Sequence, residues 1–187
     1  MHEPIFLSEP EILEGLSEVR RSPVDDGSLE AIVIRPERNL RKELDSCQLS
    51  PTEGVKGDHW AGGCWKSLPD GRPDPDVQIC IMNSRMINLL AGARSRWALA
   101  GDNLFVDLNL SRDHLAEGQR LQIGSCVIEI TEVPHNGCRK FSERFGHDAL
   151  VVVNSDAGKH ERLRGIYARV VVAGTVNVGD RIRKVTA

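Results

Sequence analysis

The stretch GQRLQIGSCVIEITEVPHNGCRKFSERFG, residues 118–146, shows how this chain is built. Two strand-like runs, RLQIG at 120–124 and SCVIEITEV at 125–133, predict consecutive strands. A turn that holds Cys138 follows, and the run ALVVVN at 149–154 predicts a further strand after it. Short strands separated by Gly-containing turns are typical of an all-β sandwich or barrel.

The same pattern continues toward both ends of the chain. Further predicted strands are SLEAIVIRP (28–36), VQICIM (77–82), LFVDL (104–108), IYARVVVAG (166–174) and RIRKV (181–185). An N-terminal helix is predicted where Ser8 can act as a cap and Pro10 suits the first turn. A second short helix is predicted over residues 86–92, where Gly92 ends it. The sequence therefore predicts a mainly β fold, a closed or partly closed antiparallel β-barrel with a few short helices.

The length of 187 residues is sufficient for one hydrophobic core. Residues 1–50, with the N-terminal helix and first strand, are expected to form an extension packed on the barrel. Residues 51–187 are expected to form the barrel domain itself. Within it, residues 53–75 are rich in glycine and proline and predict a long loop that is either functional or mobile.

Composition excludes several classes of function. A formal net charge of −3 argues against a non-specific binder of nucleic acid or of membrane surfaces. The aromatic share of 4% argues against a stacking platform for single-stranded nucleic acid. The chain has no apolar leader, no run long enough to span a membrane and an odd count of five cysteines without close pairing. These features predict a cytoplasmic protein with reduced thiols.

Cys138 is the cysteine whose surroundings favour chemistry. It lies between Gly137 and the cations Arg139 and Lys140, a setting that favours the thiolate over the thiol. Such a thiolate suits a metal ligand or a nucleophile, whereas the alternative is an inert cysteine at the barrel rim. Cys126 lies in an apolar strand and is expected to be packed, so we expect an alkylating reagent to label Cys138 first.

Four sequence blocks, taken together, resemble a known family. They are VKGDHW (55–60), GDNLFVDL (101–108), the stretch 118–146 quoted above and RLRGIYARVVVAGTVNVGDRIRKV (162–185). In this order they resemble a MOSC domain, the family named for the C-terminal domain of molybdenum-cofactor sulfurases. The family includes stand-alone bacterial proteins and amidoxime-reducing enzymes. The resemblance implies a β-rich barrel that binds a molybdopterin-type molybdenum cofactor, with Cys138 as molybdenum ligand or sulfur carrier. The family is also associated with pyridoxal phosphate binding.

The resemblance assigns two loops to the mouth of the cofactor site. In the first, Asp58 can orient a cation or accept a pterin N–H, and His59 can hydrogen-bond a bound oxo group, with Lys56 beside them; the alternative is a simple turn. In the second, Asn103 has the donor and the acceptor that reading a pterin edge requires. Asp102 stands where family members commonly carry a glutamate, one methylene longer.

The turn before Cys138 departs from the family pattern. A proline often directly precedes the family's cysteine, whereas here Pro134 is followed by His135, Asn136 and Gly137. His135 can shuttle a proton near neutral pH, or it is an ordinary surface histidine.

A cationic pocket for the cofactor phosphate is the second implication of the resemblance. Arg164, together with Arg162, precedes the last long strand, and an arginine fork matches phosphate geometry. Arg139, Lys140 and Lys56 can contribute to the same pocket.

The predicted activity is a molybdenum-cofactor-dependent reduction of N-hydroxylated or similar small compounds. The chain has no cysteine quartet for an iron–sulfur cluster and no dinucleotide fingerprint, so a separate electron-donor protein is implied. Three alternatives stay open. The first is a carrier that holds the cofactor or a Cys138 persulfide, the second is a degenerate barrel, and the third is a structural zinc site at His59, Cys64, His135 and Cys138. A homodimer is also left open.

Overall fold

The computed structural model describes residues 6–185. Seven strands form a closed barrel in the order β11–β7–β8–β9–β5–β6–β1, and β1 pairs with β11 to complete the ring. Their bounds are β1 Gly27–Ile34, β5 Ile79–Asn83, β6 Leu104–Asp107, β7 Arg120–Ile123, β8 Cys126–Ile130, β9 Ile166–Val172 and β11 Arg181–Lys184. Among the described strands one neighbouring pair, β5 and β6, is parallel and the other pairs are antiparallel. The predicted barrel is confirmed.

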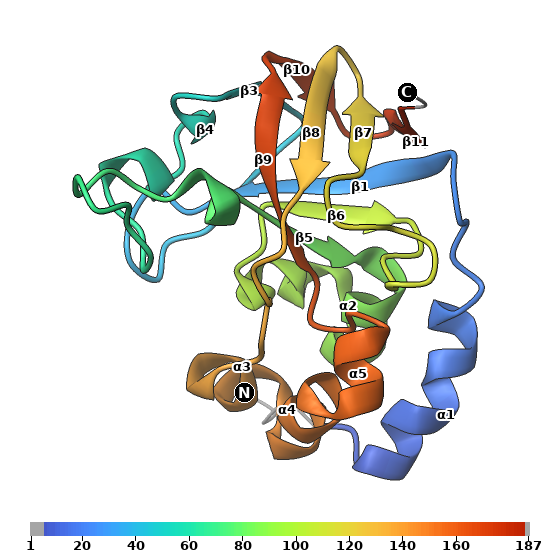
Figure 1. Ribbon diagram of the computed structural model, residues 1–187. Coiled ribbons are helices and arrows are strands. Elements are labelled where there is room, and N and C mark those ends of the chain that lie inside the picture. The colour runs from blue at the N-terminus through green and yellow to red at the C-terminus, as the bar shows by residue number, and fades with distance from the viewer. Residues whose placement is uncertain (1–5, 186–187) are drawn as a thin grey trace.

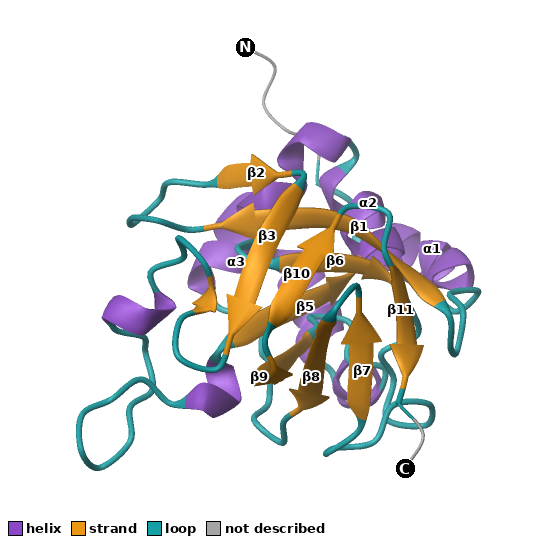
Figure 2. Cartoon of the chain, turned by 90° about the horizontal axis from the view of Figure 1, so that it is seen from above, coloured by secondary structure: helices purple, strands orange, loops and turns teal. Residues whose placement is uncertain are grey.

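Short strands extend the barrel at its rim. β2 (Lys42–Leu44) pairs with β1, and a separate small sheet consists of β10 (Gly174–Asn177), β3 (Ser46–Ser50) and β4 (Gly54–Val55). Figure 2 shows this small sheet lying across one end of the barrel. The long loop of residues 56–74, which contains the short 3-10 helix η1 (Trp60–Gly62), projects to one side in Figures 1 and 2.

The α-helices gather on the side of the barrel away from the small sheet of β3, β4 and β10, below the barrel in Figure 1. They are α1 (Glu9–Val19), α2 (Ser84–Ala91), α3 (Arg139–Phe145), α4 (His147–Asn154) and α5 (Asp156–His160), and the 3-10 helix η3 (Arg94–Ala100) packs with them. The 3-10 helix η2 (Pro75–Val77) packs against β9 instead. The predicted N-terminal helix is confirmed, and Ser8 caps it in a reciprocal pair with Glu11. The second predicted helix is α2, which Gly92 ends in the left-handed conformation. Among residues 6–185 no helix is long and apolar enough to cross a bilayer.

Two layers of apolar side chains hold the fold together. Along β1, Leu29 and Ile32 point into the barrel, whereas Ala31 and Val33 pack against the helices. The strand is therefore buried on both faces, which explains its nearly continuous apolar sequence. Because β1 belongs to the predicted N-terminal extension, that extension supplies a barrel strand. The division at residue 50 itself stays a prediction.

The prediction of a strand at residues 149–154 is wrong. These residues form α4, and Ala149, Val152 and Val153 are buried on its inner face. A continuous apolar run of this length fits a buried strand or a buried helix equally well, so periodicity could not separate them. The strand expected over 125–133 is also shorter, because β8 ends at Ile130.

Candidate active site

Cys138 occupies the residue directly before α3, and it is exposed. The side chain of Asn154, at the end of α4, fixes the turn before it: Gly137 N–H donates to Asn154 Oδ1 at 2.8 Å, and Asn154 Nδ2 donates to the Gly137 carbonyl at 3.0 Å. A β-carbon at Gly137 would lie 2.8 Å from a methyl group of Leu150, so α4 packs closely against this turn. Helix α4 therefore positions the thiol.

A cavity of about 700 Å³ opens beside Cys138. Six cationic side chains line it: Arg35, Arg41, Arg139, Lys140, Arg144 and Arg164. Aromatic rings form another part of its wall, where Tyr167 contacts Trp65 and His135 in tilted pairs at centroid distances of 6.3 and 4.3 Å. No Asp or Glu lines the cavity among the residues that the structure describes. The charge of the walls favours an anionic ligand.

Arg35 is held by a buried network at the end of β1. Its Nε and Nη2 donate to the two carboxylate oxygens of Asp58, both at 2.9 Å. Burial alone would raise the pKa of Asp58, but the bonds and charge of Arg35 hold that pKa below its ordinary value. Asn103 completes the network, because its oxygen accepts from Arg35 Nη2 and the Cys80 amide while its nitrogen donates to Asp58 and the Val33 carbonyl.

Arg164 has an equivalent partner in Asp102. Its Nη1 donates to Asp102 Oδ2 at 2.8 Å, and the carboxylate is fully buried. Burial raises the pKa of Asp102, against the opposing charge of Arg164. Asp58 and Asp102 thus offset the charges of Arg35 and Arg164 from behind the cavity wall. Each carboxylate affects a bound ligand only through the arginine that it holds.

His135 lies next to this second pair. Its Nδ1 is 3.7 Å from Asp102 Oδ1, and neither of these buried atoms has a hydrogen-bond partner. Burial, and then the charges of Arg164 and Arg35, lower the pKa of His135 well below 6.5. The imidazole is therefore neutral at physiological pH, when it can donate a proton from one nitrogen and accept at the other.

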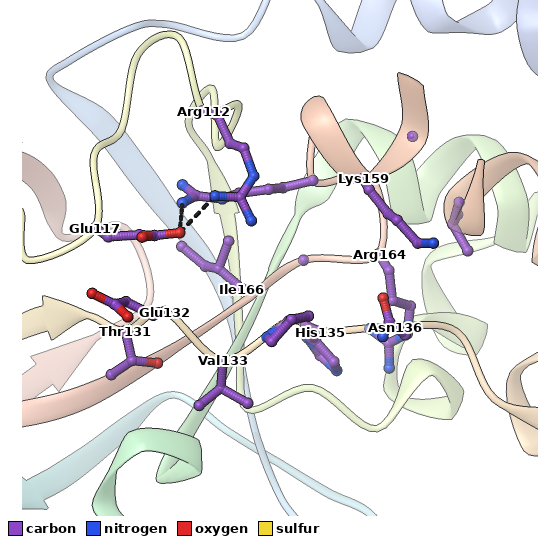
Figure 3. A pocket seen from close by; sticks show the side chains of 15 residues that line it. Arg112, Glu117, Thr131, Glu132, Val133, His135, Asn136, Lys159, Arg164 and Ile166 are labelled. Carbon is purple, nitrogen blue, oxygen red and sulfur yellow. Dashed lines mark hydrogen bonds and ion pairs between the residues drawn. The ribbon is translucent and has the colours of Figure 1, made fainter. Parts of the chain in front are cut away.

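His135 and Arg164 also line a second, smaller cavity of about 270 Å³ (Figure 3). Both side chains line the two cavities, so they form the wall between them. At the other end of this cavity Arg112 bonds to Glu117, as Figure 3 shows. Arg162 also lines it, but its Nη1 donates to the carbonyls of Leu110 and Leu115. This arginine fixes the loop that precedes β7.

The structure brings together most of the residues that the sequence singled out. Those that line the main cavity are Cys138, His135, His59, Arg139, Lys140 and Arg164. Asp58, which the resemblance assigns to the mouth of the cofactor site, is 1% exposed and is bonded to Arg35, so it does not line the cavity itself. Asp102 and Asn103 are buried too, and every amide hydrogen bond of Asn103 is made inside the protein. Lys56 lies away from the cavity and donates to Gln48.

Three cavity arginines were missed by the sequence reasoning: Arg35, Arg41 and Arg144. A signal existed for Arg144, because it lies four residues after Lys140 and such residues share one helix face. Arg35 lies near the end of the strand predicted over 28–36, and Arg41 has no distinctive local pattern. Their convergence depends on long-range pairing of β1 with β6, which the sequence does not show.

The zinc alternative has no preformed ligand set. His59, Cys64, His135 and Cys138 all line the main cavity. Within the described part of the chain, however, no three His, Cys, Asp or Glu side chains gather closely enough to hold a metal ion. One candidate ligand, Cys64, donates its thiol proton to the Lys66 carbonyl at 2.7 Å.

Comparisons with known proteins agree with this architecture. The family model of the MOSC domain matches residues 72–183, which is more than half of the chain. Among solved structures, YuaD from Bacillus subtilis has a TM-score of 0.57 and 21% identity, covering 83% of this chain and 93% of its own. YiiM from Escherichia coli has a TM-score of 0.55 and 17% identity, covering 86% and 70%. These structural likenesses show the fold alone. No curated protein matches the chain.

Proposed function

Because the chain belongs to the MOSC domain family, we propose that it binds a molybdopterin-type molybdenum cofactor and reduces N-hydroxylated or similar small compounds. The observation that carries the proposal is an exposed thiol, Cys138, beside a large cavity whose described lining holds six cations and no carboxylate. A molybdopterin is an anion that carries a phosphate, and the molybdenum that it holds can take a protein thiolate as a ligand. The donor set and the charge of the walls fit such a group.

Each cavity residue then has a distinct part. The Cys138 thiolate is the metal ligand, and Arg164, Lys140 and Arg139 supply positive charge around it. Trp65 and Tyr167 offer flat faces to a planar ring at one wall. When bound, the molybdenum supplies two-electron oxygen-atom transfer chemistry.

Protons are the second requirement of the reaction. Reduction of an N–OH group to N–H consumes two electrons and two protons and releases water. His135 is neutral and buried in the cavity wall, so it can donate a hydrogen bond from one ring nitrogen and accept one at the other, and in this way relay a proton. The electrons are proposed to come from a separate donor protein.

Cofactor content is the decisive measurement. The protein, purified from a host that makes molybdopterin, is expected to contain molybdenum, and Cys138→Ser is expected to lose it while keeping the melting temperature. Cys64→Ser is the matched control, since Cys64 lines the same cavity and should leave the metal content unchanged. The loaded protein with an artificial electron donor should then consume a hydroxylamine. Full molybdenum content in Cys138→Ser would overturn the assignment of the ligand.

A sulfur or cofactor carrier is the second candidate, and the exposure of Cys138 favours it, because a partner protein can reach the thiol. In that case the Cys138 persulfide would pass its outer sulfur to an acceptor thiolate, leaving Cys138 as a thiolate. Mass spectrometry separates the candidates, because a carrier shows a stable added sulfur on Cys138 without molybdenum.

A bound pyridoxal phosphate would show in the absorption spectrum and would point to Lys140, the lysine of the cavity wall.

A further inference from the structure

Two arginines of the cavity wall have no carboxylate partner among residues 6–185. Arg41 Nη1 donates to the carbonyl of Leu40 at 2.7 Å, and its Nε is buried without any hydrogen-bond partner. Arg144 Nη1 donates to the carbonyl of Leu99, also at 2.7 Å. By contrast, Arg35 and Arg164 in the same wall are each paired with a buried aspartate.

The two guanidinium groups converge on Gly101. This glycine ends η3 with a φ of +85°, and it has no side chain to fill the space in front of it. A β-carbon there would lie 3.5 Å from Arg41 Nη2 and 4.0 Å from Arg144 Nη1. The two nitrogens therefore border one small gap. Arg35 borders it as well, since its Nη1 donates to the Gly101 carbonyl at 2.9 Å.

Arg144 is held rigidly in this position. Its carbonyl accepts a bond from Arg96 Nη2 at 2.7 Å, while its own side chain reaches back to Leu99 in η3. Helix α3 and η3 are thus tied together at the gap. A preformed arrangement of donors loses little side-chain entropy when a ligand binds.

The arrangement is electrostatically incomplete without an anion. Burial, and then the charges of Arg144 and Arg35, lower the pKa of Arg41. Two partly buried cations that face one gap repel each other, and structural arginines are normally paired. Guanidinium forks match the oxygens of a phosphate group, and two of them balance its two charges.

We propose that Arg41 and Arg144, around Gly101, form a binding site for a tetrahedral dianionic oxyanion, the phosphate monoester group of a ligand. Two sources of that group share this chemistry: the phosphate of a pterin cofactor and the phosphate of a phosphorylated substrate. The site is built from residues that do not include Cys138. It deepens the proposed function, yet the binding of inorganic phosphate does not depend on molybdenum.

The test uses calorimetric titration of the full chain with inorganic phosphate at fixed ionic strength, with nitrate as the monoanion. Wild-type protein is expected to bind one phosphate and to discriminate against nitrate. Arg41→Gln and Arg144→Gln should each weaken phosphate binding at least about tenfold. Arg94→Gln is the matched control, because Arg94 lies in η3, is paired with exposed Glu43 and does not line the cavity. It should change the affinity less than about twofold.

Melting temperatures keep the test independent of folding. Phosphate should raise the melting temperature of the wild type, whereas without phosphate Arg41→Gln should melt at the wild-type temperature or above it, because a repulsion is removed. A lower melting temperature of Arg41→Gln in phosphate-free buffer would show that Arg41 is structural and overturn the proposal. Equal weakening by Arg94→Gln would overturn it too, as it would show diffuse attraction to an adventitious ion only.

A second arm distinguishes the two sources. If the cofactor supplies the phosphate, Arg41→Gln should lose molybdopterin and cofactor-loaded wild type should no longer bind inorganic phosphate. If a substrate supplies it, loaded wild type should still bind phosphate. Cys138→Ser should bind phosphate in both cases, so failure of the proposed activity leaves this site testable. Loss of phosphate binding in a folded Cys138→Ser would contradict a site separate from the thiol.

Discussion

At the scale of single residues, the burial of His135 links the stability of the fold to pH. Its side chain is 6% exposed and stacks on Tyr167, and the cations Arg164 and Arg35 and the buried Asp102 surround it. The folded protein therefore keeps the imidazole neutral, whereas the unfolded chain takes up a proton near the ordinary value of 6.5. Below that pH the unfolded state binds more protons, so stability must fall as pH falls.

We expect wild-type stability to decrease by as much as about 1.4 kcal/mol for each pH unit below 6.5, relative to His135→Gln. Urea denaturation at pH 7.5, 6.5, 5.5 and 5.0 measures the effect as the difference between the two proteins. Above the unfolded pKa the difference should be constant. His147→Gln, at an exposed site, should follow the wild-type curve. A parallel curve for His135→Gln would show that the buried imidazole is not held neutral.

At the scale of elements, the helix that the sequence misassigned matters most for the site. The run at residues 149–154 carries Asn154, whose side chain closes two hydrogen bonds on Gly137 next to Cys138. Nothing in the run distinguishes a buried helix from a buried strand, and read as a strand Asn154 is only a terminal turn residue. The other barrel strands and the helices α1 and α2 were predicted from β-branched runs and helix caps, which are local signals. Helix α3, which follows Cys138 directly, was not predicted.

Asn154→Ala should therefore loosen the turn before Cys138 more than it destabilises the whole chain. Two hydrogen bonds of about 1 kcal/mol each are lost, and the Gly137 amide becomes free to exchange with solvent. Hydrogen-exchange mass spectrometry should show faster exchange at residues 134–138, together with lower molybdenum retention. Val151→Ala is the control, because Val151 is an exposed residue of the same helix. Unchanged protection of the turn in Asn154→Ala would contradict the positioning role.

At the scale of the whole molecule, the barrel class follows from the sequence but the composition of its site does not. Cys138, Arg139 and Lys140 are neighbours in the chain, so their association was visible from the start. Arg35, Arg41 and Gly101 meet only because β1 returns to pair with β6 and β11. Such contacts join distant positions, and no local pattern reports them.

The same topology makes the N-terminal part indispensable. The family model begins at residue 72, yet β1 supplies the strand that joins β6 to β11. Without it the barrel has two open edges, and unpaired edges promote association between chains. We expect residues 72–187 alone to show no cooperative thermal transition and to aggregate.

Co-expression of residues 1–71 with residues 72–187 should restore a soluble complex, because β1 can pair on both sides in trans and its apolar residues complete both core layers. Differential scanning calorimetry and light scattering measure the two outcomes. Ala31→Asp in the 1–71 fragment is the control, since Ala31 is 1% exposed and a charge there should abolish the rescue. A monomeric, cooperatively melting 72–187 fragment would instead mean that β6 and β11 can close on each other, and that residues 1–71 are an extension packed on a complete barrel.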